Sequence, residues 1–294
     1  MTLIPPGSTT THVTVDGNEL RVLTSTATPA HDRTPLLLVH GGGSDNAAIS
    51  WYEMFEAFGE DRTVIAPDLP GFGGSIDVTP VGGADQMADV VAAVAAELDI
   101  STATVVGVSM GGEVALQLAL RHPELVAGVV AIAPGGLVGV FRNKPAQFGA
   151  WLAAHLPDVL LRPLARVANR YVDRALRAMV KDPATLPEEV VAEFVAESQL
   201  PDAGMAYGRY NQASLGPLSM RNNLLPVVEL ITVPALFFHG ADDPLVPPEG
   251  SREAARRMPD AELVLVPDCG HWAQLEAGER FRTELRRFLV RLDT

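Results

Sequence analysis

The chain has 294 residues and a formal net charge of −14 at pH 7. A chain of this length can bury a substantial core in one or two domains, and its charge argues against nucleic acid, whose phosphates it would repel. Its one cysteine excludes an intramolecular disulfide and argues against a cysteine-based metal site. No apolar run is long enough to span a membrane, and no secretory signal pattern is visible. We therefore expect a cytoplasmic protein without a membrane partner.

The first half of the chain predicts a parallel sheet. A hairpin is expected over residues 11–24, around Asp16-Gly17, because that pair suits a tight turn between alternating residues. Strand-like and helix-like stretches then alternate, which is typical of a parallel sheet with helices on both faces. The predicted strands are 35–40, 62–67, 103–108 and 126–133, and the predicted helices are 47–58, 84–98 and 110–121.

The alternation stops after Ala133, at Pro134-Gly135-Gly136. From there to Pro217 the pattern is helical and is interrupted by prolines, and strands resume at Val233. We interpret residues 135–217 as a helical cap inserted into a core formed by residues 1–134 and 218–294.

A serine lies at the turn between a predicted strand and a predicted helix, in Gly107-Val108-Ser109-Met110-Gly111. Glycines on either side let the backbone adopt a strained turn that projects the serine hydroxyl outward. The backbone N–H of Met110 is then at a helix N-terminus beside it. This pattern is typical of a nucleophilic serine.

A serine nucleophile needs a base and an acid that orients the base, and in this architecture they follow in the order serine, acid, histidine. Asp242 and Asp243 follow one predicted strand, and His271 follows the next. Both loops come after strand carboxyl ends, the edge at which open α/β sheets build their sites. The spacing alone leaves both aspartates open.

A glycine-rich loop follows the strand at 35–40, in His40-Gly41-Gly42-Gly43. Loops of this kind supply backbone N–H donors for an oxyanion hole. We expect His40 to support the loop by hydrogen bonding. His239 and Cys269 are expected to be buried packing residues.

These motifs together resemble the α/β-hydrolase family over nearly the whole chain. Further matches are Asp68–Ser75, which fits D-x-P-G-F-G-x-S, and His122-Pro123-Glu124. The resemblance is to meta-cleavage-product hydrolases in particular, which cut carbon–carbon bonds, through residues 40–43, 109–112 and 269–274. It implies a mostly parallel eight-stranded sheet. It also implies these roles: Ser109 as nucleophile, His271 as base, Asp243 as the orienting acid three residues after Gly240, and the N–H groups of Gly42 and Met110 as the oxyanion hole.

The chain departs from those carbon–carbon hydrolases at the residues that hold their substrate. They carry an asparagine before the nucleophile, where Val108 stands, and a second asparagine in the oxyanion loop, where Trp51 is nearest. Their cap carries an Arg-Trp pair, and this sequence contains none. We therefore expect a hydrolase of uncharged carboxylic esters. Carbon–carbon cleavage, a cofactor-free perhydrolase and a non-enzymatic receptor are the alternatives.

Substrate contacts are the least constrained part of the site. Gly43, Trp151, Leu152 and Trp272 are candidates, the middle two because they fit an apolar face of a cap helix. We expect no cofactor and no metal, because no ligand cluster is visible. The expected partner is a small-molecule substrate, with a homodimer left open. A row of arginines from Arg162 to Arg177 is interpreted as a solvated face.

Overall fold

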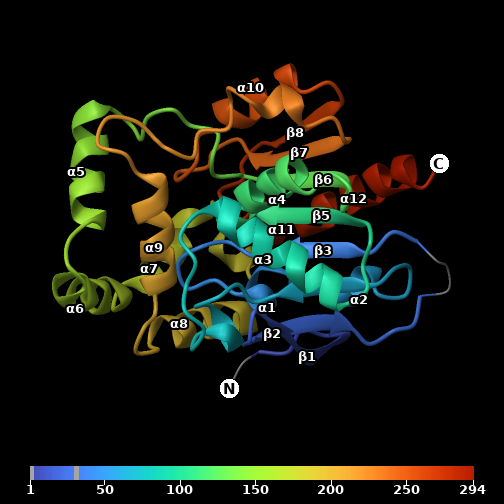
Figure 1. Cartoon of the computed structure of the whole chain (residues 1–294), viewed down its shortest axis with the longest axis horizontal. Helices are drawn as coiled ribbons and strands as arrows, with labels where there is room; N and C mark the ends of the chain where they lie inside the picture. The colour runs from blue at the N-terminus through green and yellow to red at the C-terminus, as the bar shows by residue number, and fades with distance from the viewer. Residues whose placement is uncertain (1–2, 30–32) are drawn as a thin grey trace.

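A mixed β-sheet forms the centre of the molecule, and helices cover both of its faces (Figure 1). The structure is a computed structural model, which describes residues 3–29 and 33–294. Within those ranges the sheet has eight strands in the order β1-β2-β4-β3-β5-β6-β7-β8. The strands are β1 (Ser8–Val15), β2 (Asn18–Ser25), β3 (Leu36–Val39), β4 (Val64–Pro67), β5 (Ala103–Val108), β6 (Val126–Ile132), β7 (Ala235–Gly240) and β8 (Ala261–Val266).

The sheet is mostly parallel, as predicted. From β4 to β8 in the sheet order every neighbouring pair is parallel, whereas β1 and β2 add an antiparallel edge. The predicted hairpin joins these two edge strands. Its turn residues, Asp16 and Gly17, have φ angles of 50° and 79°, and a two-residue hairpin turn with both φ values positive is favoured by such residues.

Apolar cores lie on both faces of the sheet, because side chains alternate along each strand. In β3, Leu37 and Val39 belong to one core, which contains residues of α3 and α4. Leu36 and Leu38 belong to the other, which contains residues of α1, α2 and α12. All four side chains are fully buried, as expected for a strand covered on both faces.

The helices largely follow the predicted pattern, with one correction. They are α1 (Ala47–Ser50), α2 (Met54–Phe58), α3 (Ala84–Glu97), α4 (Met110–Arg121), α5 (Lys144–Ala154), α6 (Asp158–Asn169), α7 (Val172–Met179), α8 (Glu188–Ser198), α9 (Met205–Ser214), α10 (Glu249–Arg257), α11 (Ala273–Glu276) and α12 (Gly278–Leu292), with short 3-10 turns η1 (Gly73–Ser75), η2 (Pro183–Thr185) and η3 (Val228–Leu230). The single helix predicted over 47–58 is two helices. Trp51 leaves helical geometry between them, and its side chain is fully buried in the core, so tertiary packing overrides helical propensity here.

The chain leaves the sheet after β6 and returns at β7. Ala133 and Gly136 have positive φ angles of 41° and 74°, which turn the backbone away from the strand direction. The helices from α5 to α9 then follow, and they lie at one end of the sheet, beyond β3 and β5, in Figure 1. We call residues 135–217 the cap segment. Its separation from the core as a second domain stays an interpretation.

No helix in the described ranges is both long and apolar enough to cross a membrane.

Candidate active site

The serine turn predicted from the sequence is present between β5 and α4. Ser109 has φ 56° and ψ −118°, an unusual backbone conformation for a residue with a side chain. Neither flanking glycine could carry a side chain: a Cβ at Gly107 would lie 2.0 Å from the carbonyl oxygen of Gly111, and one at Gly111 would lie 2.2 Å from that of Val39. The glycines are therefore required by close backbone packing around the serine.

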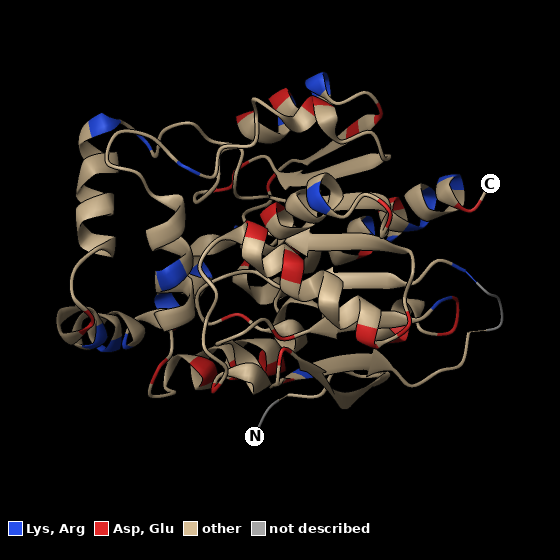
Figure 2. Ribbon diagram, in the orientation of Figure 1, with Lys and Arg blue, Asp and Glu red and all other residues tan. Residues whose placement is uncertain are grey.

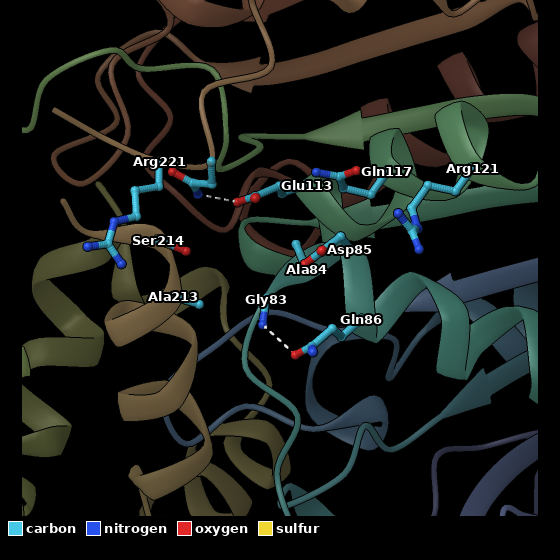
Figure 3. Close-up of a pocket in the computed structure, with 11 residues that line it drawn as sticks. Gly83, Ala84, Asp85, Gln86, Glu113, Gln117, Arg121, Ala213, Ser214 and Arg221 are labelled. Atoms are coloured by element: carbon cyan, nitrogen blue, oxygen red, sulfur yellow. Dashed lines mark hydrogen bonds between the residues drawn. The ribbon is translucent and has the colours of Figure 1, made fainter.

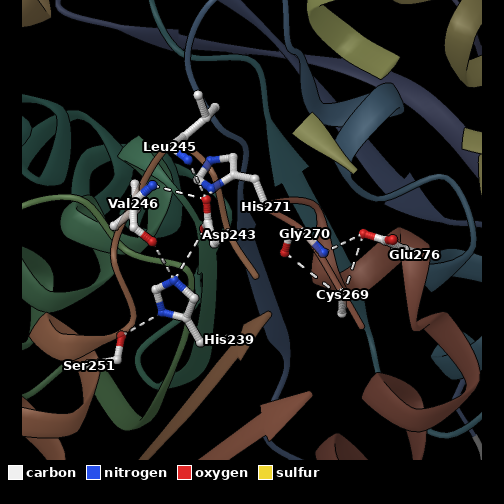
Figure 4. Close-up of polar contacts among 9 residues, drawn as sticks. All are labelled: His239, Asp243, Leu245, Val246, Ser251, Cys269, Gly270, His271 and Glu276. Atoms are coloured by element: carbon white, nitrogen blue, oxygen red, sulfur yellow. Dashed lines mark hydrogen bonds and ion pairs between the residues drawn. The ribbon is translucent and has the colours of Figure 1, made fainter. Parts of the chain in front are cut away.

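Asp243 and His271 meet beyond the ends of β7 and β8 (Figure 4). His271 Nδ1 lies 2.7 Å from Asp243 Oδ2 and donates to it, an assignment that follows from the carboxylate accepting only. The other carboxylate oxygen, Oδ1, accepts the backbone N–H groups of Leu245 at 2.8 Å and Val246 at 2.9 Å. Backbone donors thus fix the carboxylate, and the carboxylate fixes the imidazole.

A second histidine supports the same carboxylate. His239 Nε2 lies 3.2 Å from Asp243 Oδ2 and 3.0 Å from the carbonyl oxygen of Val246, and its Nδ1 lies 2.9 Å from Ser251 Oγ. Burial raises the pKa of the Asp243 carboxyl, but hydrogen bonds from His239 and His271 outweigh it and hold that pKa well below its usual range. Asp243 is therefore ionised in the folded protein near neutral pH. His239 is a buried residue with its hydrogen bonds satisfied, as predicted, and its contact with Asp243 was not foreseen.

The neighbouring aspartate faces away from this pair. The Asp242 side chain is 45% exposed, and its Oδ2 lies 3.9 Å from Lys181 Nζ. Of the two aspartates that the sequence left open, Asp243 is the one that contacts His271.

Ser109 and His271 are not hydrogen-bonded to one another in the residues that the structure describes. His271 is almost fully buried, and its backbone N–H donates to the carbonyl oxygen of Met179, in the cap segment, at 2.7 Å. Catalytic hydrogen bonds in unliganded enzymes are often long and tighten only when substrate binds. The geometry therefore shows the acid–histidine pair directly, and the serine's role stays a proposal.

Hydrogen bonds on both sides hold the glycine-rich loop after β3. The N–H of Gly41 donates to Asp45 Oδ2 at 2.9 Å, and His40 Nδ1 lies 2.7 Å from the Gly41 carbonyl oxygen. His40 Nε2 accepts the N–H of Leu69 at 3.0 Å, so its other nitrogen is the donor. His40 therefore supports the loop by hydrogen bonding, as predicted. Burial raises the pKa of Asp45 to about 7.

Gly42, the predicted oxyanion donor, lies directly under an aromatic ring of the cap segment. A Cβ at Gly42 would be 2.3 Å from both Cδ2 and Cε2 of Tyr207, which is on α9. Met110, the other predicted donor, is the first residue of α4, where backbone N–H groups have no partner within the helix. Nothing in the sequence indicated a role for Tyr207 at the site, because an aromatic residue in a predicted helix is ordinarily a packing residue.

The four candidate substrate contacts lie in different surroundings. Gly43 has a φ of +83° and open space where a Cβ would be. Trp151 packs against Phe148 and His155, Leu152 is exposed, and Trp272 is buried edge-on against Phe194 of α8. Trp272 thus packs against the cap segment. Contact with substrate stays a prediction for all four.

An apolar cavity of about 340 Å³ lies inside the cap segment, among α5, α6 and α9. Its lining includes Leu156, Leu161, Leu164 and Tyr207. Tyr207 therefore separates this cavity from Gly42. A cavity of this size is large enough for a short alkyl or aryl group.

A second cavity, polar and about 490 Å³ in volume, lies against α4 (Figure 3). Glu113, one turn after Ser109, is fully buried beside it, and Glu113 Oε2 accepts hydrogen bonds from the Tyr210 hydroxyl at 2.5 Å and from Asn222 Nδ2 at 2.7 Å. Burial raises the pKa of Glu113 to about 7. The Tyr210 bond joins the helix after Ser109 to the cap segment. The sequence did not indicate either bond, since a glutamate in an amphipathic helix is ordinarily exposed.

The described residues contain no group of three or more histidine, cysteine or acidic side chains placed to hold a metal ion. The buried Cys269, as predicted, is a packing residue, and burial raises the pKa of its thiol to about 12.

Comparison with known proteins identifies the family. The alpha/beta hydrolase fold family matches residues 34–278, and the chain belongs to it. A 2-hydroxy-6-oxononadienedioate/2-hydroxy-6-oxononatrienedioate hydrolase from Burkholderia vietnamiensis is 32% identical over 286 residues, which cover 95% of this chain and 94% of that protein. The structure of a 2-hydroxy-6-oxo-6-phenylhexa-2,4-dienoate hydrolase from Rhodococcus has a TM-score of 0.75 at 24% identity, covering 96% of this chain and 98% of the other. The predicted fold and the predicted resemblance to meta-cleavage-product hydrolases are confirmed.

Another relative is longer than this chain, and only part of it matches. The dihydrolipoyllysine-residue acetyltransferase component of an acetoin cleaving system from Pseudomonas putida is 30% identical over 256 residues, which cover 87% of this chain. The match spans 63% of that relative, so the rest of it has no counterpart in the alignment. The comparisons together support a hydrolase.

Proposed function

We propose that this α/β hydrolase cleaves uncharged carboxylic esters through an acyl-enzyme. Ser109 is the nucleophile, His271 the general base and Asp243 the group that orients it. The N–H groups of Gly42 and Met110 bind the oxyanion. The observation that carries the proposal is the Asp243–His271 contact of 2.7 Å at the same edge of the sheet as the strained Ser109 turn.

The reaction runs in two balanced steps. Ser109 Oγ attacks the ester carbonyl while His271 Nε2 takes its proton, and the negative charge forms on the carbonyl oxygen. When the tetrahedral intermediate collapses, His271 returns the proton to the departing alkoxide, which leaves as an alcohol. A water molecule then attacks the acyl-enzyme with His271 as base, and the carboxylic acid and free Ser109 are released.

The apolar cavity supports an uncharged substrate. Among the residues that line it, Arg209 is the cation, and its guanidinium already contacts Asp158 Oδ2 at 2.5 Å. A carboxylate placed in this cavity would therefore meet no unpaired cation of the lining, and burying an unpaired charge is costly. An alkyl or aryl group would instead gain from burial, by about 0.8 kcal/mol per methylene.

Carbon–carbon hydrolysis is the second candidate, and the activities for which the dienoate hydrolase relatives are named favour it. Against it stand Val108 before the nucleophile and the lack of an Arg-Trp pair in this sequence. The same triad would serve either reaction, so the difference lies in how the substrate is held.

Steady-state kinetics test the proposal. We expect kcat/KM for a p-nitrophenyl ester of a short fatty acid to exceed that for a 2-hydroxy-6-oxo-dienoate by at least about tenfold. Ser109→Ala should lower ester turnover by about 10⁴-fold or more while leaving thermal unfolding unchanged. A preference of the same size for the dienoate would replace the ester proposal by the carbon–carbon one. Unchanged turnover in Ser109→Ala would contradict both the ester and the carbon–carbon proposals. Adding peroxide as the acyl acceptor tests the perhydrolase alternative.

A further inference from the structure

Helix α6 lies at the outer edge of the cap segment (Figure 1). Large apolar side chains on it are exposed to solvent. Val159 is 74% exposed, Leu160 51%, Leu164 55% and Val167 52%. Because residues four apart share a side of a helix, Val159 and Val167 lie on one strip and Leu160 and Leu164 on the strip beside it. Exposed apolar surface of this kind indicates an interaction site.

Arginines border the apolar strips. Arg162, Arg166 and Arg170 also recur at four-residue spacing, and they lie on the flank next to Val159. Arg162 is paired with Asp202, whereas Arg166 and Arg170 form no ion pair with any residue that the structure describes. Leu160 and Leu164 lie on the opposite flank, and Leu164 also lines the apolar cavity. The exposed half of α6 is thus apolar with a basic border.

This basic border is unusual for the protein as a whole. Residues 158–177 contain five arginines and two aspartates, while the whole chain has a net charge of −14. Figure 2 shows blue segments on α6, whereas acidic residues are scattered over the sheet and its helices. An anionic surface would therefore attract this helix and repel the rest of the molecule.

We propose that α6 docks on the surface of an anionic lipid bilayer, lying in the plane of the headgroups. Its valines and leucines would enter the boundary between headgroups and acyl chains, while Arg166 and Arg170 contact lipid phosphates. Phe148 and Leu152, exposed on the neighbouring helix α5, add apolar side chains at the same end of the molecule. Surface docking needs no spanning helix.

Charge favours a lipid surface over a second copy of the chain. In a symmetric dimer built on α6, the same face would meet itself, so the unpaired arginines of both copies would be brought together. Lipid phosphates neutralise those arginines instead. Leu164 is exposed and also lines the cavity, so one wall of the cavity is formed by a residue of the proposed docking helix. Docking through α6 is independent of the reaction catalysed.

Co-sedimentation of the full chain with vesicles tests the proposal. The wild type should bind vesicles containing about one third phosphatidylglycerol, bind pure phosphatidylcholine at least about tenfold more weakly, and lose binding in high salt. Arg166→Gln with Arg170→Gln should weaken binding about tenfold or more. Val159→Asp with Val167→Asp should abolish it, because charges would enter the apolar boundary.

Matched controls come from α10 and α12, which lie outside the cap segment. Val290→Asp, on α12 at 64% exposure, and Arg252→Gln, on α10, remove the same kinds of exposed side chain and should leave vesicle binding unchanged. Thermal unfolding by circular dichroism reports on the fold of each variant. Wild-type protein that stays in the supernatant would overturn the proposal, as would equal losses in the control variants. So would a dimer in sedimentation velocity that Val159→Asp with Val167→Asp dissociates, if vesicles are not bound.

Discussion

The ring of Tyr207 lies against the backbone of Gly42, so close that a Cβ at Gly42 would be 2.3 Å from two of its carbons. Tyr207 is on α9 in the cap segment, and Gly42 is in the loop after β3. Tyr207 therefore covers the Gly42 side of the proposed oxyanion hole, and its position depends on the cap. Movement of α9 would open or close this part of the site.

A double-mutant cycle tests this contact. Gly42→Ala should lower kcat/KM by about 10²-fold, because the new methyl group displaces either the ring or the N–H donor. Gly42→Ala combined with Tyr207→Ala should recover at least about tenfold of that loss, since the collision is gone. Gly149→Ala, on α5 with open space around it, is the control for adding a methyl group. Equal losses in the single and double variants would show that the ring does not constrain the loop.

The two adjacent aspartates should differ sharply. Asp243→Asn should lower kcat by about 10⁴-fold, because an amide would favour the wrong tautomer of His271. Asp242→Asn should have little effect, because this side chain is 45% exposed and contacts Lys181 rather than His271. Steady-state kinetics of both variants on the same ester give the comparison, and the reverse order would contradict the assigned triad.

The order of strands and helices could be predicted because it follows from local patterns. Uninterrupted apolar runs gave β5 and β6, and Asp16-Gly17 gave the hairpin, since these signals lie within a few neighbouring residues. The same holds for the Ser109 turn and the glycine-rich loop. The break at Trp51 could not be predicted, because it depends on burial of the ring in a core formed by distant segments.

The cross-segment contacts of the site were also beyond prediction. Tyr207 is far from Gly42 in the chain, and Tyr210 is 97 residues from Glu113, and nothing in either local pattern marks the partner. For the proposed acid, spacing leaves two aspartates open and the family resemblance selects Asp243, which is the one that contacts His271. Motifs therefore indicated the candidate reacting groups, while the residues that hold the cap against them required the fold.

Glu276 connects the cap segment to the loop after β8, which carries His271 (Figure 4). Its Oε2 accepts the N–H of Gly270 at 2.7 Å, and its Oε1 accepts those of Lys181 at 2.7 Å and Asp182 at 2.9 Å. One carboxylate thus holds the residue before His271 and the chain that follows α7. We infer that Glu276 positions His271 without contacting substrate.

Glu276→Ala should lower kcat by about tenfold to 10²-fold with a smaller change in KM, because His271 would sample unproductive positions. It should also lower the free energy of unfolding by about 1–3 kcal/mol, since three backbone donors lose their acceptor. Glu276→Gln should fall between Glu276→Ala and wild type in both measurements. Exposed Glu279→Ala is the control. A variant that loses stability but keeps kcat would limit Glu276 to a structural role.

Glu113 should make stability depend on pH. Burial raises the pKa of its carboxyl from 4.5 to about 7 in the folded protein, so the folded state keeps a proton that the unfolded chain has already released between those values. The neutral carboxyl therefore contributes fully to stability below the unfolded-state pKa of 4.5. This contribution is lost as the pH rises through the folded-state pKa of about 7.

Replacement of Glu113 by glutamine isolates this contribution, because an amide has no proton to release in this range. The unfolding free energy of Glu113→Gln minus that of wild type should rise from about pH 5 to about pH 8, since only the wild type loses stability as its carboxyl ionises. Taking this difference cancels the contributions of other buried acids, such as Asp45, because they titrate in both proteins. Glu124→Gln, exposed beyond the end of α4, controls for the loss of one carboxyl. Urea unfolding at each pH gives the values, and a difference that stays constant or falls with pH would show that Glu113 is already ionised in the folded protein.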